Sequence, residues 1–421
     1  MGFAQGVSGL NASASNLDVI GNNIANSGPI GFKSGSVQFS DVYAGSRVGL
    51  GAQVAGVSQN FTSGAVQLSS RALDVAIVNG DGFFRLASAG GGEISYSRNG
   101  QFNMDKDGFI VNSAGLQLTG FPVGANGSVA GGSPAALKLP TTAMQPNPTQ
   151  NIAAQFNLDS RSIAPAAATP FDSNNSSTYN YANAVTVYDS LGNSHELSTF
   201  FVKDSVVNTW NVFATADGKP LATGGAFAPA PPAAGNNGTA VASGVTFDGN
   251  GALTAPANGK MLFSGLDFGN GSAPVNFTLD VTGTTQFGNV NDVKKLTQDG
   301  YTSGTLTTFA INQNGTVNGK YSNEQTKALG QIVLSSFANP NGMQSKGGNV
   351  WAETAASGQP LTGTPGEGTK MGALQSGALE ASNVDLTAEL VNLIIAQRTY
   401  QANAQTVKTQ DQVMQTLVNL R

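Results

Sequence analysis

His195 is the only histidine of the 421-residue chain, and it stands next to Glu196. Any Ser-His-Asp triad would have to centre on it, yet the sequence has no Gly-x-Ser-x-Gly turn of the kind that presents a serine nucleophile. Asp74 and Asp81 could serve as the carboxylate pair of a glycosidase, although aspartate is ordinary at strand edges and turns such as theirs. We therefore expect no catalytic residues.

Two short acidic stretches resemble the start of a calcium loop: Asp105–Gly108 and Asp248–Gly251. The twelfth position of a calcium loop carries a bidentate Glu, but here those positions hold Leu116 and Gly259. Hairpin turns explain both stretches better. The chain has no cysteine, which removes thiolate metal sites and disulfides. We expect no metal site and no cofactor.

The surface chemistry of the chain is mostly neutral. Charged residues make up 11% of it, glycine accounts for 54 residues, and the net charge is −5. Such a balance argues against nucleic acid as a partner. The longest strongly apolar run, Leu390–Ala396, is too short to cross a bilayer, and the residues before Lys33 include no Lys or Arg for the basic start of a cleaved signal. We expect no stable membrane insertion and export without a cleaved signal peptide.

Apolar residues at alternating spacings of four and three predict a helix with an apolar seam at each end of the chain. Ser382 and Asp385 fit a capping box before the second helix. The residues predicted for the seams, which we propose as assembly residues, are Val7, Leu10, Leu17 and Ile24 in the first helix and Leu386, Leu390, Leu393, Tyr400, Val407, Met414 and Val418 in the second.

Between these helices the pattern is β. Short alternating runs are separated by Asn-Gly and Asp-Gly pairs, which favour tight turns. The segment "YANAVTVYDSLGNSHELSTFFVK" predicts a β-hairpin. The fold class is thus mainly β with terminal α-helices, in a nested multi-domain order. We expect helical ends at 1–28 and 380–421, linkers at 29–70 and 364–379, a discontinuous β core at 71–145 and 291–363, and an inserted β-barrel or sandwich domain at 146–290.

The terminal helices carry few charges and much Asn, which is a mediocre helix former. We infer that they are weakly structured in a free subunit and fold when neighbouring subunits supply the missing packing. The periodicity alone equally allows the alternative that they pack as a coiled-coil-like pair on their own β domain.

The motifs themselves resemble a known family. "SNLDVIGNNIANSGPIGFKSG", from Ser15, looks like the N-terminal signature of bacterial flagellar rod and hook axial proteins. "SGALEASNVDLTAELVNLIIAQRTYQANAQ", from Ser376, resembles that family's C-terminal signature, and "ALDVAIVNGDGFFRL" with "YSRNGQFNMDKDGFIVNSAGLQLTGFP" resembles its shared β core. "NIAAQFNLDS" and the predicted hairpin are similar to the middle domain of hook proteins. The length and this domain favour a hook subunit over a distal rod protein; a secreted β-rich enzyme or sugar-binding module is a remote alternative.

The resemblance implies a structural role. Subunits of this family leave the cell through the flagellar type III export apparatus and self-assemble as a helical polymer beyond the rod. The hook is a curved hollow tube that works as a universal joint for motility and as an export conduit, with the terminal helices lining its inner wall. The implied partners are other copies of the chain, the rod and hook–filament junction proteins, the hook cap protein and the export apparatus, and the implied location is the extracellular flagellum at the basal body.

Overall fold

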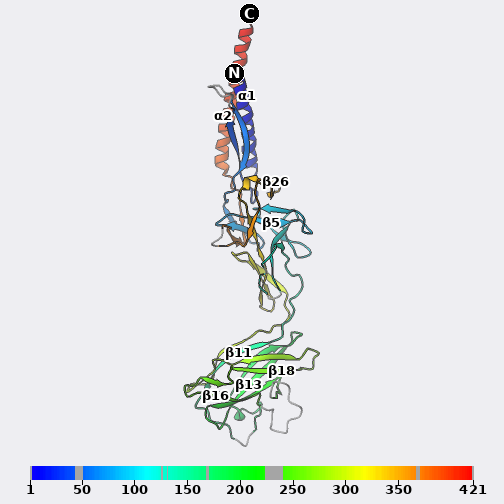
Figure 1. Cartoon of the computed structure of the whole chain (residues 1–421), viewed down its shortest axis with the longest axis vertical. Helices are drawn as coiled ribbons and strands as arrows, with labels where there is room; N and C mark the ends of the chain where they lie inside the picture. The colour runs from blue at the N-terminus through cyan, green and yellow to red at the C-terminus, as the bar shows by residue number, and fades with distance from the viewer. Residues whose placement is uncertain are drawn as a thin grey trace. The chain divides into compact units, whose positions relative to one another are not determined.

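The computed structural model describes these residues: 2–42, 51–124, 127–129, 131–166, 170–222, 240–366 and 370–419. Within them the chain is mostly β-strand, with an α-helix near each end, as the sequence predicts (Figure 1). The chain divides into two compact units. Unit 1 comprises Met1–Thr141, Thr307–Lys320 and Thr326–Arg421, and unit 2 comprises Thr142–Leu306 and Tyr321–Gln325.

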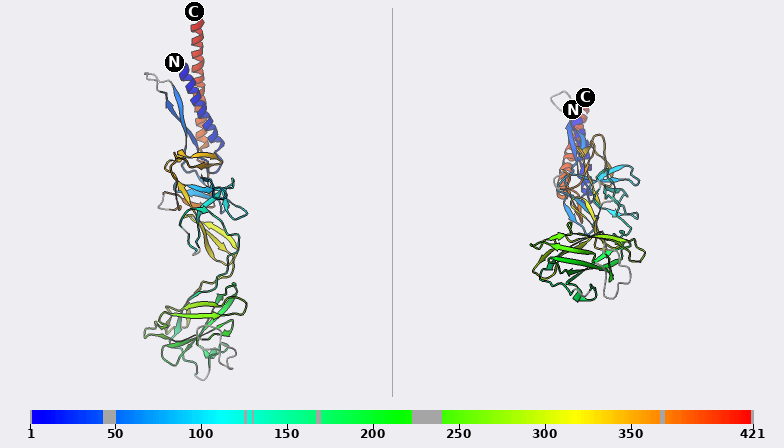
Figure 2. Two further views of the ribbon diagram at one scale, coloured as in Figure 1. Left: turned by 45° about the vertical axis from the view of Figure 1, so that its right-hand side comes forward. Right: turned by 60° about the horizontal axis from the view of Figure 1, so that its bottom comes forward.

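The two helices of unit 1, α1 (Gly2–Ala25) and α2 (Leu386–Asn419), pack against each other along their length. They run antiparallel, because Gly6 lies against Val407 while Asn23 is bonded to Glu389. The C-terminal turns of α2 extend past the first residue of α1 (Figure 2). Residues from the two ends of the chain therefore form one helical pair.

Helix α2 begins one residue after its N-cap. The Asp385 carboxylate accepts hydrogen bonds from the backbone N–H groups of Thr387 and Ala388, at 2.9 and 3.1 Å, which is the usual role of an N-cap side chain. The expected capping box that started at Ser382 is wrong. The Ser382 hydroxyl instead accepts from the N–H of Val384 and closes a turn just before the helix.

A β-hairpin lies beside α1 in unit 1 (Figure 2). It consists of β1 (Gly35–Asp41) and β2 (Ala52–Gln59), which pair antiparallel. We expected residues 29–70 to be a linker, and the structure corrects this. The hairpin was missed because its large apolar residues, Val37, Phe39, Val54 and Val57, stand among Gly, Ala, Ser and Gln, and the alternation that marks a half-buried strand does not continue through β2.

The β part of unit 1 joins segments from both halves of the chain. β3 pairs with β30 and β4 with β29, so the second expected linker, 364–379, is also strand in part. Its core contains Phe84, Phe102 and Ile332. The strands are β3 (Val66–Leu68), β4 (Val75–Val78), β5 (Phe83–Ala87), β6 (Ile94–Ser97), β7 (Asn103–Met104), β8 (Ile110–Val111), β9 (Gln117–Pro122), β10 (Ala135–Ala136), β22 (Leu306–Ile311), β23 (Thr316–Tyr321), β24 (Thr326–Ile332), β25 (Leu334–Ser336), β26 (Gln344–Gly347), β27 (Val350–Ala352), β28 (Leu361–Gly363), β29 (Ala373–Ser376) and β30 (Ala378–Glu380).

Unit 2 is built from two sheets that share one hydrophobic core around Phe156, Trp210 and Phe277. The predicted hairpin is confirmed: β12 and β13 pair antiparallel, with Tyr188 opposite Ser194. One sheet has the order β12-β13-β14-β16-β17, and the other β18-β19-β11-β20. The strands are β11 (Asn151–Asp159), β12 (Tyr181–Tyr188), β13 (Ser194–Lys203), β14 (Thr209–Ala216), β15 (Lys219–Pro220), β16 (Ala242–Phe247), β17 (Leu253–Ala255), β18 (Lys260–Leu266), β19 (Val275–Asp280), β20 (Thr285–Phe287) and β21 (Asp292–Gln298).

The chain enters and leaves unit 2 through two paired segments. Met144 bridges Gly304, and Asn147 bridges Tyr301. The expected limits of the inserted domain, 146 and 290, are too narrow, because β21 pairs antiparallel with β11 inside unit 2. Residues 291–306 therefore do not belong to the β core to which the sequence pattern assigned them.

Candidate assembly surface

Two glycines set how closely α1 and α2 approach. A Cβ atom on Gly6 would lie 2.8 Å from Val407 Cγ2, and one on Gly9 would lie 2.8 Å from Asn403 Nδ2. Real Cβ atoms do not approach other heavy atoms so closely. Glycine is a poor helix former, so its presence here is explained by the space that the partner helix occupies.

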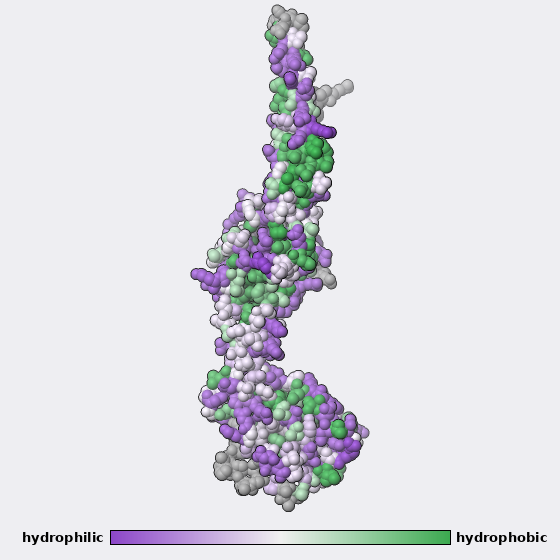
Figure 3. Space-filling model, turned by 180° about the vertical axis from the view of Figure 1, so that it is seen from behind, coloured by the Kyte–Doolittle hydropathy of each residue, from purple (hydrophilic) through white to green (hydrophobic). Residues whose placement is uncertain are grey.

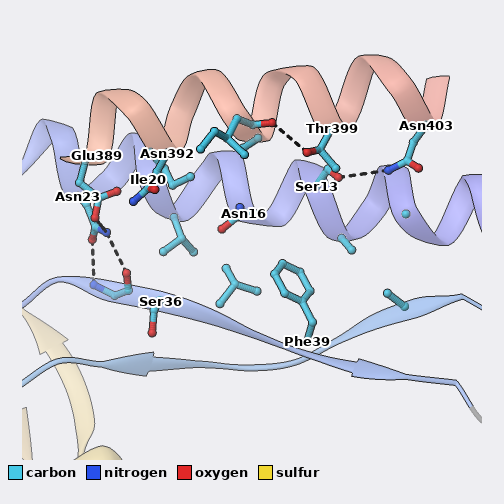
Figure 4. A pocket seen from close by; sticks show the side chains of 18 residues that line it. Ser13, Asn16, Ile20, Asn23, Ser36, Phe39, Glu389, Asn392, Thr399 and Asn403 are labelled. Carbon is cyan, nitrogen blue, oxygen red and sulfur yellow. Dashed lines mark hydrogen bonds between the residues drawn. The ribbon is translucent and has the colours of Figure 1, made fainter. Parts of the chain in front are cut away.

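Hydrogen bonds of the Asn23 side chain connect the helical pair to the hairpin (Figure 4). Asn23, 2% exposed, donates to the Gly35 carbonyl at 2.8 Å and accepts from the Gly35 N–H at 2.9 Å. The same side-chain amide lies 3.2 Å from Glu389 Oε1 on α2. Asn23 thus connects α1, β1 and α2, because one amide can both donate and accept.

A groove of about 500 Å³ runs between α1, α2 and the β1–β2 hairpin (Figure 4). Its lining mixes apolar and uncharged polar side chains, with Glu389 as the charged member. The lining residues are Gly9, Ala12, Ser13, Asn16, Val19, Ile20, Asn23, Gly35, Ser36, Val37, Phe39, Ala52, Glu389, Asn392, Ile395, Ala396, Thr399 and Asn403.

The residues predicted for the apolar seam of α2 do not all lie on the same face of the helix. Val407 contacts Gly6 of α1, as expected for a seam residue. The predicted apolar residues that remain exposed, by 41% to 72%, are Leu386, Leu390, Tyr400, Met414 and Val418; Leu393 is half-buried. In α1, the predicted residues Val7, Leu10, Leu17 and Ile24 are all half-buried.

The side of α2 that meets α1 is small and polar, and our sequence reasoning missed it. Ala396 is 4% exposed, and Asn403 reaches Ser13 Oγ at 3.5 Å. Glu389, Ala396 and Asn403 are spaced by seven residues, which places them on one face of the helix. A search for repeated apolar residues does not detect this repeat, because two of the three residues are polar. Glu389 lies outside the predicted apolar seam, and its carboxylate accepts a hydrogen bond from Asn23 of α1.

The apolar face of α2 points away from its partner helix in a single subunit. Val391 and Ile394 add to it, each more than half exposed, whereas Ile395 lines the groove beside the hairpin. Figure 3 shows apolar residues gathered on the helical end of the chain. Soluble monomers rarely leave a contiguous apolar patch of this kind open, and such patches commonly mark interaction sites.

A buried ion cluster anchors this helical end to the β part of unit 1. Lys33 and Arg98 both contact Glu380, at 2.5 and 3.4 Å, and all three side chains are at most 1% exposed. Burial lowers the pKa of Lys33 and of Arg98, and the charge of Glu380 works against that effect. Ser34 and Asn383, next to the cluster, are joined by a hydrogen bond of 2.8 Å. The two signature segments found in the sequence therefore meet here.

The residues considered for chemistry serve local structure. Asp105 Oδ1 accepts from the N–H groups of Asp107 and Phe109, and Asp248 does the same for residues two and four further on, so both close turns. Asp74 accepts from Ser69 Oγ at 2.5 Å. Among the described residues no three acidic or histidine side chains gather as metal ligands would.

Four segments of the chain match models of known protein families, and these matches define the class of protein. Residues 5–33 match the family described as "Flagella basal body rod protein", and residues 77–157 match "Flagellar hook protein FlgE/F/G D1 domain". Residues 157–301 match "Flagellar basal body protein FlaE D2 domain", and residues 375–420 match "Flagellar basal body rod FlgEFG protein C-terminal". These matches follow one another along the chain and define a flagellar axial protein.

Full-length relatives narrow the class. The flagellar hook protein FlgE of Escherichia coli (strain K12) is 47% identical over 424 residues, covering 100% of both chains. The corresponding protein of Borreliella burgdorferi is 33% identical over 453 residues, covering 99% of this chain and 98% of the relative. A crystal structure of Helicobacter pylori flagellar hook protein FlgE2 shares the fold, with a TM-score of 0.52, 14% identity, and coverage of 75% of this chain and 100% of that one.

The chain belongs to the flagellar hook protein family. It is a structural subunit of the hook, in a family of structural proteins that polymerise in the bacterial flagellum. Neither described helix combines the length and the hydropathy that a membrane span needs.

Proposed function

We propose that the subunits polymerise through their terminal helices into the curved hollow tube of the hook. The observation that carries this proposal is the apolar face of α2, with Leu390 45% and Ile394 51% exposed. Burying one large aliphatic side chain stabilises an assembly by about 1.5–3 kcal/mol. A neighbouring subunit that covers this face would supply the packing that a single subunit lacks.

In this proposal the helical ends form the inner wall of the tube and the β parts of unit 1 and unit 2 form its outer layers. The wall bears few charges: α1 carries Asp18, and α2 carries Glu389, Arg398, Lys408 and Asp411. Asn, Ser and Gln side chains on such a wall would hold neither charged nor apolar passengers strongly. The tube would then serve both as a universal joint and as an export conduit.

The finer aspects of the biological role are part of the same proposal. The subunit is exported through the type III apparatus without a cleaved signal peptide, and it has no catalytic activity. Its partners are the rod, the hook–filament junction proteins, the hook cap protein and further copies of itself. That the helices are weakly structured before assembly stays a prediction.

The proposal is tested by adding purified subunit to isolated hooks and measuring hook length by electron microscopy. Wild-type subunit should lengthen the hooks into a curved tube. Leu393→Asp places a carboxylate on the helix face that assembly would bury, where an unpaired charge costs several kcal/mol. Because every subunit carries the defect, we expect no extension. Leu393→Met keeps the volume and the apolar character and should extend hooks normally.

The thermal unfolding of the β parts separates two explanations of a failed extension. We expect it to be unchanged in Leu393→Asp, since Leu393 lies on a helix outside the β cores. Normal extension by Leu393→Asp would overturn the proposal that this face is buried in the tube. Global unfolding of the variant would mean that the helix belongs to the subunit's own core.

A further inference from the structure

Helix α2 continues beyond the end of its partner helix. It has 34 residues against 24 in α1, and Gly6, near the start of α1, already lies against Val407. The last turns of α2 therefore project past the first residue of α1, as Figure 2 shows. We call the described part of this projection, residues 412–419, the overhang.

The overhang carries the same contact face as the part of α2 that packs on α1. Met414 follows Val407 by seven residues, so the two side chains lie on one face of the helix. Val407 is half-buried against Gly6, whereas Met414 is 60% exposed because α1 has already ended. Val418, one turn further on, is 72% exposed. The interface between the two helices thus continues into a segment that its own subunit leaves largely exposed.

The overhang is apolar in part and carries no charge. Residues 412–419 include no Asp, Glu, Lys or Arg, and Val413 adds a further apolar side chain that is 49% exposed. Apolar surface of this kind gains free energy when it is removed from water. The overhang therefore fits a partner surface that is itself apolar in part and mostly neutral.

The groove between α1, α2 and the β1–β2 hairpin is such a surface (Figure 4). Phe39 on the hairpin and Ile395 on α2 both line it and are 49% and 57% exposed, so each offers apolar area to an occupant. Its charged lining residue, Glu389, already accepts a hydrogen bond from Asn23. The groove volume, about 500 Å³, lies within the roughly 300–1,000 Å³ that is typical of binding clefts.

A subunit cannot fill this groove with its own overhang. The α2 residues that line the groove end at Asn403. Met414 lies about 16 Å further along the same helix, at a rise of about 1.5 Å per residue, and the helix runs away from the groove in that direction. An overhang that enters the groove must therefore come from a second copy of the chain.

We propose that the overhang of one subunit docks in the groove between α1, α2 and the hairpin of a second copy. This inference rests on the proposed function, because it names the surface on which one helical end meets the next. The overhang and the groove are different parts of the subunit, so the contact is head-to-tail. Such a contact does not close as a two-fold dimer does, and it propagates along a polymer.

The contact also sets the offset between the two copies. In a polar polymer all subunits point the same way, so the donor of the overhang is displaced from the acceptor along the helix axis. Ala396 lies midway along the α2 wall of the groove, and the distance from it to Met414 along the helix is about 27 Å. A cryo-EM map of the hook should show two contacting copies displaced by this amount along α2.

The chain contains no cysteine, so engineered cysteines report the contact without background. Purified subunit that carries both Phe39→Cys and Met414→Cys is added to isolated hooks, and the extended hooks are treated with a short thiol crosslinker. We expect a ladder of covalently linked subunits on a denaturing gel. The matched control combines Leu68→Cys with Met414→Cys, because Leu68 is 83% exposed in unit 1 but does not line the groove. It should give no ladder.

Two single substitutions test the same contact through hook extension. Met414→Asp places a carboxylate on the contact face, where a buried unpaired charge is costly, so the rate of extension should fall at least about tenfold. Gln412→Asp adds the same charge to the same turn of the helix, but on the opposite side. It should extend hooks at the wild-type rate.

The outcomes separate this inference from the assembly proposal. Hooks that extend with the Phe39→Cys and Met414→Cys subunit but yield no ladder would overturn the docking of the overhang. Equal rates of extension by Met414→Asp and Gln412→Asp would overturn it as well, and this pair decides if the double-cysteine subunit does not extend hooks. In each of these cases Leu393→Asp should still block extension, so the assembly proposal would stand.

Discussion

Lys33 Nζ and Glu380 Oε1 lie 2.5 Å apart although the residues are 347 positions apart in the chain. Glu380 also accepts from the Gly64 N–H at 2.9 Å, and its main-chain carbonyl accepts from the Gly31 N–H at 2.8 Å. Lys33 donates a further hydrogen bond of 2.7 Å to the Thr62 carbonyl. This buried pair joins the segment that leaves α1 to the segment that leads into α2.

Removing the carboxylate from this cluster should destabilise unit 1 strongly. In Glu380→Gln, both Lys33 and Arg98 remain buried without their counter-charge, and breaking a buried pair in this way costs about 3–5 kcal/mol. We expect that decrease in the free energy of unfolding, measured by urea titration with hydrogen exchange in β4 and β29 as the readout for unit 1.

The matched control is Glu93→Gln. Glu93 contacts Lys346, but both side chains are substantially exposed, at 63% and 35%. An exposed pair contributes about 0–1 kcal/mol. If the two substitutions cost the same, the buried cluster does not hold the chain ends together as we describe.

A pair of glycine substitutions tests the packing of the helices. A Cβ on Gly6 meets Val407, whereas a Cβ on Gly21 meets nothing within 4 Å. Gly21→Ala should stabilise α1 by about 0.5–1 kcal/mol, since alanine is the better helix former. In the assembled hook, Gly6→Ala should instead push α2 away and speed hydrogen exchange in both helices. Equal protection in the two variants would show that the helices do not touch at Gly6.

The limits of unit 2 are testable with two fragments. A fragment of residues 142–306 contains β21 and both bridged segments, Met144 with Gly304 and Asn147 with Tyr301. It should unfold cooperatively with a β-type circular dichroism spectrum. A fragment of residues 146–290 lacks β21 and leaves one side of β11 unpaired, so its unfolding temperature should be lower. The narrower limits would be right if the shorter fragment were as stable as the longer one.

Acid should weaken the base of unit 2 through Asp299. Burial would raise the pKa of Asp299, but hydrogen bonds from the N–H groups of Asn151 and Gln150 and from the Asn151 side chain lower it below its ordinary 3.8. The folded unit therefore binds this proton less readily than the unfolded chain does. The stabilisation is complete above pH 3.8 and is lost as the pH falls through the lowered folded-state pKa. The unfolding temperature of the 142–306 fragment measures this loss.

The comparison variant for the acid experiment is Asp299→Asn. It cannot ionise, so its unfolding temperature should already be lower at neutral pH and should decline less steeply in acid. Parallel decline in both proteins would assign the acid sensitivity to other carboxylates of unit 2.

Sequence patterns predicted the elements whose signals are local. The alternation around Val185 and the turn at Leu191–Gly192 indicated the β12–β13 hairpin, and the spacing of apolar residues indicated both helices. The face on which the helices meet was not predictable from apolar residues, because Gly6, Ala396 and Asn403 form the contact. An apolar stripe predicts that one face of a helix is buried. It does not indicate whether that face is covered by the same subunit or by a neighbouring one.

The sequence pattern also did not predict which strands pair when they are far apart in the chain. Residues Val75–Val78 read as the first strand of a hairpin with Phe83–Ala87, since Asn79-Gly80 and Asp81-Gly82 are turn pairs. In the structure both strands exist, but β4 pairs with β29 and β5 with β6. Asn79 and Gly80 form a bend and Asp81 bridges Met371, so these pairs do not close a hairpin between the two strands. The partner of each strand was determined by long-range packing, which the local sequence pattern does not reveal.

The bridged segments at the base of unit 2 have a consequence for the order of folding. While unit 2 is unfolded, it is a long flexible loop between two parts of unit 1 that must come together, and loop-closure entropy grows with loop length. Once unit 2 has folded, Met144 and Gly304 hold its ends side by side, so the loop that unit 1 must close shrinks to a few residues. Unit 1 is thereby spared most of that entropic cost. A subunit that refolds after export would gain speed by completing its inserted unit first.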